Sequence, residues 1–279
     1  MNELHDLFQL VINTVGVFCY TMENLPSLEA SGAREIASRL KSISGGKVLD
    51  ICTGKGDFIS TLMQTLNGYE RFIGIDMSRK DLEVARKTFE GQPVQFMEMD
   101  AGNLAFDDNT FDTVCIANSL HHLSDPGAVL NEMKRVLKHG GHFIVQEMYQ
   151  DGDQSKAQIT DTLEHHWGAK IDRQLGEIHY ETLTKKEIKT LLETLEFQEL
   201  LVLEASRYVK CLVCPQRFAC ENPLNEKLID DFISGIEKEL KRLPAHKVTE
   251  ELKAEGEQLK ERAKITGVAD ASFLFFIGR

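Results

Sequence analysis

The stretch KVLDICTGKGDFISTL, residues 47–62, passes from an apolar run through a glycine turn into an amphipathic segment. The apolar run is closed by Asp50, and the turn Thr53-Gly54-Lys55-Gly56 follows it. Glycine lets the backbone approach a ligand closely. A strand, a glycine turn and a helix in this order therefore predict a pocket for a nucleotide-like cofactor.

A dinucleotide-binding fold has the same order of elements, but two details argue against a dinucleotide. The third glycine of a G-x-G-x-x-G fingerprint would fall at Ile59. The acid at the strand end, Asp50, suits a cationic ligand group better than a pyrophosphate, for which the turn offers only Lys55. A dinucleotide-dependent oxidoreductase is thus a rival hypothesis that tight binding of NADH would support.

Composition narrows the class of protein. A chain of 279 residues allows one large domain, or one domain with a substantial insertion. Its net charge of −12 argues against a nucleic-acid partner, because phosphate binding needs a basic face. The N-terminus lacks the basic segment of a signal peptide, and no apolar run approaches the roughly 20 residues of a membrane span. We therefore expect no membrane insertion, and six scattered cysteines kept as reduced thiols in a cytoplasmic protein.

From residue 47 onward, apolar runs alternate with helical patterns. We expect strands at 47–51, 71–75, 94–99, 112–117, 142–148, 197–205 and 271–277, and helices near 57–66, 78–90, 126–138 and 185–195. Caps support three of the helices: Ser78 with Asp81, Asp125 before Pro126, and Thr184 with Glu187. The alternation predicts an α/β fold, a Rossmann-like doubly wound sheet.

The pattern also predicts three parts along the chain. Residues 1–45 contain a helical period over 4–18 and a second helix that Ser27 caps, and they could form a lid. Residues 46–206 and 271–279 form the core, in which the polar stretch 150–182 is expected to be a cap loop with His165 and His166 at the surface. Residues 207–270 are a cysteine-containing helical insertion, with one helix capped by Asn222 and another over about 248–265.

Four successive strands are each closed by a polar residue: Asp50, Asp76, Asp100 and Asn118. In an open α/β sheet, ligands bind beyond the carboxyl ends of the strands. Any one of these residues could be a helix cap or a turn residue. Four on one rim would cost free energy as fold elements alone, so we expect a ligand with several polar groups.

The chemistry of these side chains suggests the ligand. Asp76 can accept both hydroxyls of a ribose, and Asp100 can accept the exocyclic amine of adenine, with Met77 and Leu104 flanking the rings. Asp50 and the Gly54–Gly56 backbone would face an amino-acid group. A ribose, an adenine and an amino acid without phosphate describe S-adenosylmethionine.

Four segments resemble the consecutive motifs of class I S-adenosylmethionine-dependent methyltransferases: VLDICTGKGDF, FIGIDMS, MDAGNLAFDDNTFDTVCIANSLHHLSDP and LNEMKRVLKHGGHFIVQEM. The resemblance runs over about 47–148, with agreement in spacing and order. The D-x-x-T-G-x-G-D form of the first motif is similar to that of the ubiquinone/menaquinone-biosynthesis C-methyltransferases, in which the first glycine of the general motif is also replaced, here by Cys52.

The resemblance implies a seven-stranded sheet whose last strand runs antiparallel between two others. It also implies that the cofactor is lined by Asp50, Thr53, Gly54, Gly56, Asp76, Met77, Asp100, Ala101 and Asn118, and Lys55 in the same turn completes our predicted set. The product would be S-adenosylhomocysteine.

Methyl transfer requires a general base only when the acceptor is protonated near neutral pH. His121 and His122, after the fourth strand, are the base candidates, although a structural histidine near a helix start is the simpler interpretation of either one. Glu147 and Tyr149, at the end of the fifth strand, are expected on the substrate side.

Two features of the insertion have simple interpretations. Cys211, Cys214 and Cys220 have C-x2-C-x5-C spacing without a matching second pair, so we predict thiols near the substrate and no metal site. The apolar stripe from Leu224 to Leu240 indicates packing on the body or contact in a homodimer.

Together these patterns predict an S-adenosylmethionine-dependent methyltransferase that acts on a small molecule. The alternative is a protein that binds S-adenosylmethionine or S-adenosylhomocysteine without catalysis and serves assembly or regulation. Accumulation of S-adenosylhomocysteine with some acceptor would distinguish the two.

Overall fold

The fold is taken from a computed structural model, which describes residues 31–212 and 222–279. The helix expected over 4–18, the Ser27 cap, Cys214 and Cys220 lie outside these ranges. The first described element is α2 (Ala33–Leu40), in the region where the second N-terminal helix was expected.

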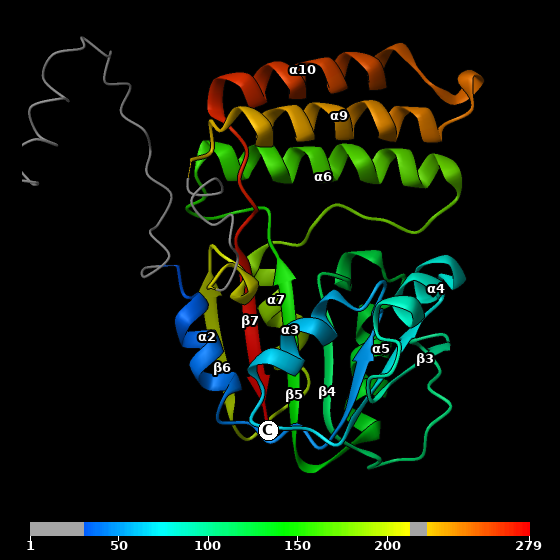
Figure 1. The fold of residues 1–279 in the computed structure, drawn as a ribbon, viewed down its shortest axis with the longest axis vertical. Helices are drawn as coiled ribbons and strands as arrows, with labels where there is room; N and C mark the ends of the chain where they lie inside the picture. The colour runs from blue at the N-terminus through cyan, green and yellow to red at the C-terminus, as the bar shows by residue number, and fades with distance from the viewer. Residues whose placement is uncertain (1–30, 213–221) are drawn as a thin grey trace, which may run out of the picture.

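Seven strands form a single sheet: β1 (Lys47–Ile51), β2 (Arg71–Asp76), β3 (Val94–Glu98), β4 (Phe111–Ala117), β5 (Leu137–Met148), β6 (Leu200–Ala205) and β7 (Phe273–Gly278). Their order is β3-β2-β1-β4-β5-β7-β6, and β7 runs antiparallel to both of its neighbours. The predicted Rossmann-like sheet with an antiparallel last strand is therefore confirmed (Figure 1). The order of the strands reverses beside β1, which is where open α/β sheets bind their ligands.

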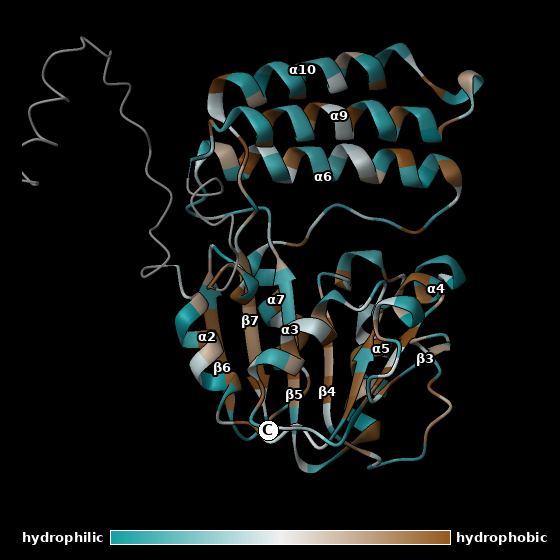
Figure 2. Cartoon of the chain, in the orientation of Figure 1, coloured by the Kyte–Doolittle hydropathy of each residue, from teal (hydrophilic) through white to brown (hydrophobic). Residues whose placement is uncertain are grey.

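Helices cover both faces of this sheet because successive strand residues point to opposite sides. On one face, Leu49 and Ile51 of β1 join the core formed with α5 (Pro126–Val136) and α7 (Lys185–Glu193). On the other, Val48 joins the core formed with α2, α3 (Asp57–Thr65) and α4 (Arg79–Thr88). Figure 2 shows the apolar residues concentrated along the strands between these helices.

Helix starts follow the predicted caps with one exception. The Ser78 side chain accepts from Asp81 N, Asp125 from Ala128 N, and Thr184 forms a full capping box with Glu187. The exception is α9 (Glu226–Arg242), which Asn225 caps instead of Asn222. Asn222 lies in the preceding turn, where its side chain accepts from Leu224 N at 3.1 Å.

Three long helices form a separate layer: α6 (Lys156–Leu175), α9 and α10 (Glu250–Thr266). We call these three the helical layer. They pack on one another around a core of their own that includes Trp167 and Ile236, and they lie across the carboxyl ends of the strands (Figure 1). The expectation of a cap loop over 150–182 is wrong for α6, because Ser155 and Gln158 form a capping box and start a helix there.

Within residues 31–212 and 222–279, no helix is both long enough and apolar enough to cross a lipid bilayer. Short 3₁₀ turns complete the described elements: η1 (Leu120–His122), η2 (Val209–Leu212) and η3 (Ala245–Lys247). The first of these, η1, follows β4 and brings two histidines to the sheet edge beneath the helical layer.

Candidate cofactor pocket and acceptor site

A cavity of about 630 Å³ lies between the carboxyl ends of β1 and β4 and the helical layer. This volume is within the roughly 300–1,000 Å³ of small-ligand sites. Predicted cofactor residues on its wall are Asp50, Thr53, Gly54, Lys55 and Asn118. The remaining members of the predicted set, Gly56, Asp76, Met77, Asp100 and Ala101, lie outside the wall of this cavity.

The turn after β1 is held in left-handed backbone conformations. Cys52, Gly54 and Gly56 have φ values of 54°, 51° and 88°. A side chain on Gly56 would also meet the Phe89 ring, whose nearest atom lies 2.5 Å from the ideal Cβ position. Cys52 adopts a conformation that L-residues rarely take, which agrees with its place where the general motif has glycine.

Asp50 is a buried carboxyl in the floor of the cavity. Its Oδ2 accepts from Thr53 Oγ1 at 2.6 Å, and its Oδ1 accepts from Cys115 Sγ at 3.3 Å. Burial raises the pKa of Asp50 from 3.8 to about 7, against the lowering effect of these two hydrogen bonds. A cationic ligand group would restore its charge.

Asn118 offers an acceptor atom with no partner in the described structure. Its backbone has φ 48°, its N donates to Gln146 O at 2.7 Å, and its Nδ2 donates to Tyr208 OH at 3.4 Å. The buried Oδ1 accepts no hydrogen bond from the described residues. Because buried polar atoms are normally paired, this oxygen indicates a ligand donor in the cavity.

Asp76 and Asp100, at the ends of β2 and just beyond β3, are both engaged by backbone. Asp76 accepts from Gly54 N and Ser78 N, each at 2.8 Å, and so ties the glycine turn to the next strand. Asp100 is exposed and accepts from Gly102 N at 2.8 Å. Since a carboxylate has about four acceptor positions, both retain capacity for ligand hydroxyls or amines.

These features fit S-adenosylmethionine. Asn118 and Asp50, whose carboxylate form a cation would favour, both suit an ammonium group. The exposed Met77 borders Asp76, where a ribose and an adenine would follow. A Cβ atom added at Gly54 would have no atom within 4 Å, so the turn is open at this position.

The opposite wall of the cavity comes from α6 and the segment after β6, through Asp161, Glu164, His165 and Tyr208. Burial raises the pKa of Asp161 and of Glu164 to about 7. Sequence reasoning missed these residues because α6 has buried threonines and glutamine in place of a clean apolar stripe. The Ser155-x-x-Gln158 capping box was the signal that could have found the helix.

His121 and Glu147 form a buried pair next to this wall. His121 Nδ1 donates to Glu147 Oε1 at 2.5 Å, and Glu147 Oε2 accepts from Ser119 N and Leu120 N at 3.0 Å each. Glu147 therefore faces His121 and the backbone of η1. Tyr149, also expected on the substrate side, is buried and donates to Glu204.

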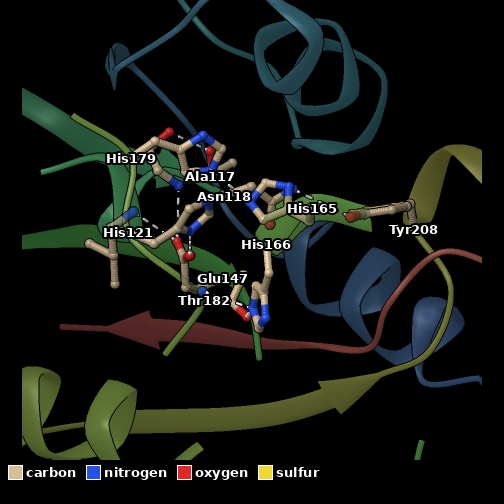
Figure 3. A network of polar contacts seen from close by, with 11 residues as sticks. Ala117, Asn118, His121, Glu147, His165, His166, His179, Thr182 and Tyr208 are labelled. Carbon is tan, nitrogen blue, oxygen red and sulfur yellow. Dashed lines mark hydrogen bonds and ion pairs between the residues drawn. The ribbon is translucent and has the colours of Figure 1, made fainter. Parts of the chain in front are cut away.

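Two further histidines meet His121. His165 Nε2 lies 2.9 Å from His121 Nε2 and 3.0 Å from His179 Nε2 (Figure 3). The prediction that His165 and His166 are surface residues of a loop is wrong. Both lie on helix α6 and are partly buried, and His166 Nε2 contacts Thr182 Oγ1 at 2.8 Å. Burial, with the neighbouring histidines, lowers the pKa of His165 to about 2 and that of His122 to about 3.

Comparison with known proteins identifies the family. The family model described as a methyltransferase domain matches residues 42–196, more than half of the chain. The demethylmenaquinone methyltransferase of Staphylococcus saprophyticus is 35% identical over 151 residues, which cover 53% of this chain and 63% of that protein. The ubiquinone/menaquinone biosynthesis C-methyltransferase of Desulfotalea psychrophila is 39% identical over 111 residues, which cover 40% of this chain and 45% of that protein.

The chain thus spans less than two thirds of the length of these curated relatives. Among solved structures, a putative methyltransferase from Bacillus halodurans superposes with a TM-score of 0.54 at 19% identity, over 87% of this chain and 95% of that one. This likeness supports the fold. The family match over residues 42–196 agrees with the motifs predicted from the sequence. The chain therefore belongs to the methyltransferase-domain family, the class I S-adenosylmethionine-dependent methyltransferases.

Proposed function

We propose that the protein transfers a methyl group from S-adenosylmethionine to a small-molecule acceptor held beneath the helical layer. The observation that carries this proposal is the cavity at the reversal of strand order, which is lined by Asn118, whose buried Oδ1 has no partner among the described residues. Small-molecule sites of α/β sheets lie at this position, and few polar groups orient the ligand there. A protein that only binds the cofactor would not need the second wall that α6 supplies.

Each predicted cofactor residue has a role in this proposal. The amino-acid end is held by Asp50, Thr53, Gly54, Lys55 and Asn118. Gly56 starts α3 at the turn, and Asp76 receives the ribose. The adenine is bordered by Met77, Asp100 and Ala101. The bound cofactor would supply an electrophilic methyl group on a sulfonium. The residues of the chain bind, orient and exclude water, and in-line displacement needs little more.

The acceptor side is formed by α6 and η1. With pKa values near 7, Asp161 and Glu164 can be neutral and accept or donate hydrogen bonds to an uncharged acceptor. We assign His121, His122 and Glu147 to the acceptor side as well. Glu147 holds the proton of His121 on Nδ1, so in the neutral ring Nε2 has a lone pair, which lies 2.9 Å from His165 Nε2. Such a nitrogen can take a proton from the acceptor or bind a cation.

The acceptor class follows from this chemistry and from the relatives. A free imidazole nitrogen serves an acceptor with an ionisable hydroxyl or an activated ring carbon, and a reduced quinone has both. A demethylmenaquinol analogue is therefore the first compound to test. We further propose that residues 207–270 and the N-terminal segment cover the acceptor, and that the α9 stripe contributes to the helical layer or to a homodimer.

Calorimetric titration with S-adenosylmethionine and S-adenosylhomocysteine tests the cofactor, with NADH as the control ligand. We expect micromolar binding of both sulfur compounds and none of NADH. Formation of S-adenosylhomocysteine is then followed with a panel of phenols, quinols and amines. Binding without product from any acceptor would favour the non-catalytic alternative, and tighter binding of NADH would overturn the cofactor assignment.

A further inference from the structure

Four histidines gather at one point beneath the helical layer. His121 and His122 come from η1, His165 from α6, and His179 from the chain after α6. One ring nitrogen from each lies within 4.8 Å of the others. We call these four the histidine cluster; Figure 3 shows three of its rings turned toward one another with Glu147 behind His121.

Carboxylates fix the orientation of two of the rings. Glu147 Oε1 lies 2.5 Å from His121 Nδ1, and Asp172 Oδ2 lies 2.6 Å from His179 Nδ1. A carboxylate can only accept, so each Nδ1 carries a proton, and in the neutral rings each Nε2 presents a lone pair. Both of these Nε2 atoms point to His165 Nε2, at 2.9 and 3.0 Å.

Hydrogen bonding alone does not satisfy this arrangement. His165 Nε2 has at most one proton, which points in one direction in the plane of the ring. It can serve His121 or His179, and the other contact then sets two acceptor nitrogens against each other. A cation at the centre would satisfy all three lone pairs at once.

Two of the three nitrogen–nitrogen distances are close to those around a tetrahedral ion. Zinc–nitrogen bonds of about 2.0–2.1 Å place neighbouring ligand nitrogens about 3.3–3.4 Å apart. The observed separations of 2.9 and 3.0 Å need to open by only a few tenths of an ångström. Imidazole ligands suit zinc, copper, iron and nickel rather than calcium or magnesium.

The residues behind the rings are themselves held in place. Glu147 accepts from two backbone N–H groups of η1, and Asp172 Oδ1 pairs with Arg242 of α9 at 2.7 Å. Carboxylates that orient ligating histidines and are hydrogen-bonded in turn are the usual outer shell of a metal site. The support therefore comes from both the sheet and the helical layer.

We propose that His121, His165 and His179 bind a divalent transition-metal ion, with Zn²⁺ as the best-matching ion, through their Nε2 atoms. Three protein ligands leave a fourth position, as in catalytic zinc sites, and the ring of His122 lies near it. His165 also lines the cavity, so the proposed metal site borders the acceptor side. If the proposed methyl transfer holds, the ion would coordinate an oxygen or nitrogen of the acceptor and lower its pKa, in place of proton transfer to His121.

Metal content tests the proposal directly. The full chain is stripped with a chelator, incubated with Zn²⁺ or Co²⁺, desalted and analysed for metal, and the visible spectrum of the Co²⁺ form reports imidazole ligation. We expect one equivalent in the unchanged protein, and at least a hundredfold weaker binding in His165→Gln and in His179→Gln.

Two controls separate this site from other ligands. His166→Gln removes the next imidazole of the same helix, whose Nε2 contacts Thr182, and should keep the metal. Cys211→Ser/Cys214→Ser/Cys220→Ser removes the thiols and should keep it as well. No retained metal in the unchanged protein, loss with the cysteines, or equal losses in His165→Gln and His166→Gln would overturn the proposal.

S-adenosylhomocysteine titration of the stripped and loaded proteins separates this inference from the proposed function. It also checks that each histidine variant is folded, because the cofactor residues of β1 are untouched. Normal S-adenosylhomocysteine binding without metal uptake refutes only the metal site. Metal uptake with no S-adenosylhomocysteine binding supports the metal site and refutes only the proposed methyl transfer.

Discussion

Glu147 Oε1 accepts a hydrogen bond from His121 Nδ1 at 2.5 Å, and neither side chain is exposed to solvent. The pair joins the end of β5 to η1 beyond β4, and so fixes the histidine cluster to the sheet. The second carboxylate oxygen of Glu147, Oε2, accepts hydrogen bonds from two backbone N–H groups at the start of η1. One buried carboxylate therefore sets both the tautomer of His121 and the shape of the turn that carries it.

Replacing Glu147 with Gln should weaken both functions of this carboxylate. An amide cannot accept from His121 Nδ1 on one atom and from two backbone N–H groups on the other. A buried donor left unpaired costs about 1–3 kcal/mol, so unfolding by urea should show a loss of that size. Loss of an outer-shell carboxylate should reduce Zn²⁺ affinity about 10–100-fold. The exposed Glu181→Gln should change neither quantity, and an unchanged Glu147→Gln protein would contradict the assignment.

Asp76→Ala should lose cofactor binding and remain folded. Two hydrogen bonds from ribose hydroxyls to a carboxylate contribute about 1.5–3 kcal/mol each, so S-adenosylhomocysteine affinity should fall at least about a hundredfold. The lost contacts with Gly54 N and Ser78 N should cost only about 1 kcal/mol of stability, because Asp76 is partly exposed. Calorimetry and thermal unfolding measure the two effects.

Glu98→Ala is the matched control for Asp76→Ala. Glu98 pairs in register with Asp76 on the neighbouring strand and forms an exposed ion pair with Arg79. Exposed ion pairs contribute little, so affinity and stability should stay close to those of the unchanged protein. Equal affinities of Asp76→Ala and Glu98→Ala would remove the ribose contact from the proposal.

The parts of the fold that local sequence determines could be predicted from it. The glycine turn after β1, the Asp125 cap before Pro126 and the Thr184 capping box each involve residues within a few positions of one another. The central strands could be predicted because each contains a short apolar run between turn residues, buried on two faces. The edge strands β3 and β6 are partly exposed. The predicted ends of strands differed from the observed ones where pairing with a neighbouring strand determines them. For example, β6 begins at Leu200 and not at 197.

The acceptor side could not be predicted in this way. α6 is polar on the face that lines the cavity and carries buried Thr160 and Thr162, so its apolar period is weak. The contact of His165 with His121 joins residues 44 positions apart, and only the packing of the helical layer on the sheet brings them together. The pattern of one histidine in a polar stretch is the same for a surface residue and for a ligand.

Cofactor affinity should depend on pH through Asp50. The free carboxyl has a pKa of about 7, whereas a bound ammonium group favours the carboxylate. S-adenosylhomocysteine affinity should thus be constant above about pH 7 and fall below it, by up to about tenfold per pH unit. In Asp50→Asn the affinity should be weaker and flat over this range. Asp161→Asn, which removes a second carboxyl with a pKa of about 7, should leave the slope intact.

The same shift predicts how the free protein responds to pH. Between 3.8 and about 7 the unfolded chain releases the Asp50 proton and the folded chain keeps it. The folded state then binds more protons, so this carboxyl lowers stability as pH rises through that window. Asp50→Asn should remove this loss, which urea unfolding at several pH values measures. A steeper decline in the variant would contradict the raised pKa.

Trp167 should be the residue on which the helical layer depends most. Its ring packs against Gly256 and Ile236, and its Nε1 donates to Leu252 O at 3.0 Å, so it joins α6 to both α9 and α10. Trp167→Ala should cost about 3–5 kcal/mol of stability. Trp167→Phe keeps the ring contact and loses the hydrogen bond, which should cost about 1–3 kcal/mol because Leu252 O is left buried.

The position of this loss also tests how the layer relates to the cavity. Trp167 lies two residues from His165 on α6 but does not line the cavity. Trp167→Phe should therefore weaken Zn²⁺ binding and leave S-adenosylhomocysteine binding within about twofold. Leu163→Ala, at an exposed position of the same helix, is the control and should change neither affinity. If Trp167→Phe weakened the binding of Zn²⁺ and of S-adenosylhomocysteine equally, the structure of the cofactor pocket would depend on the helical layer.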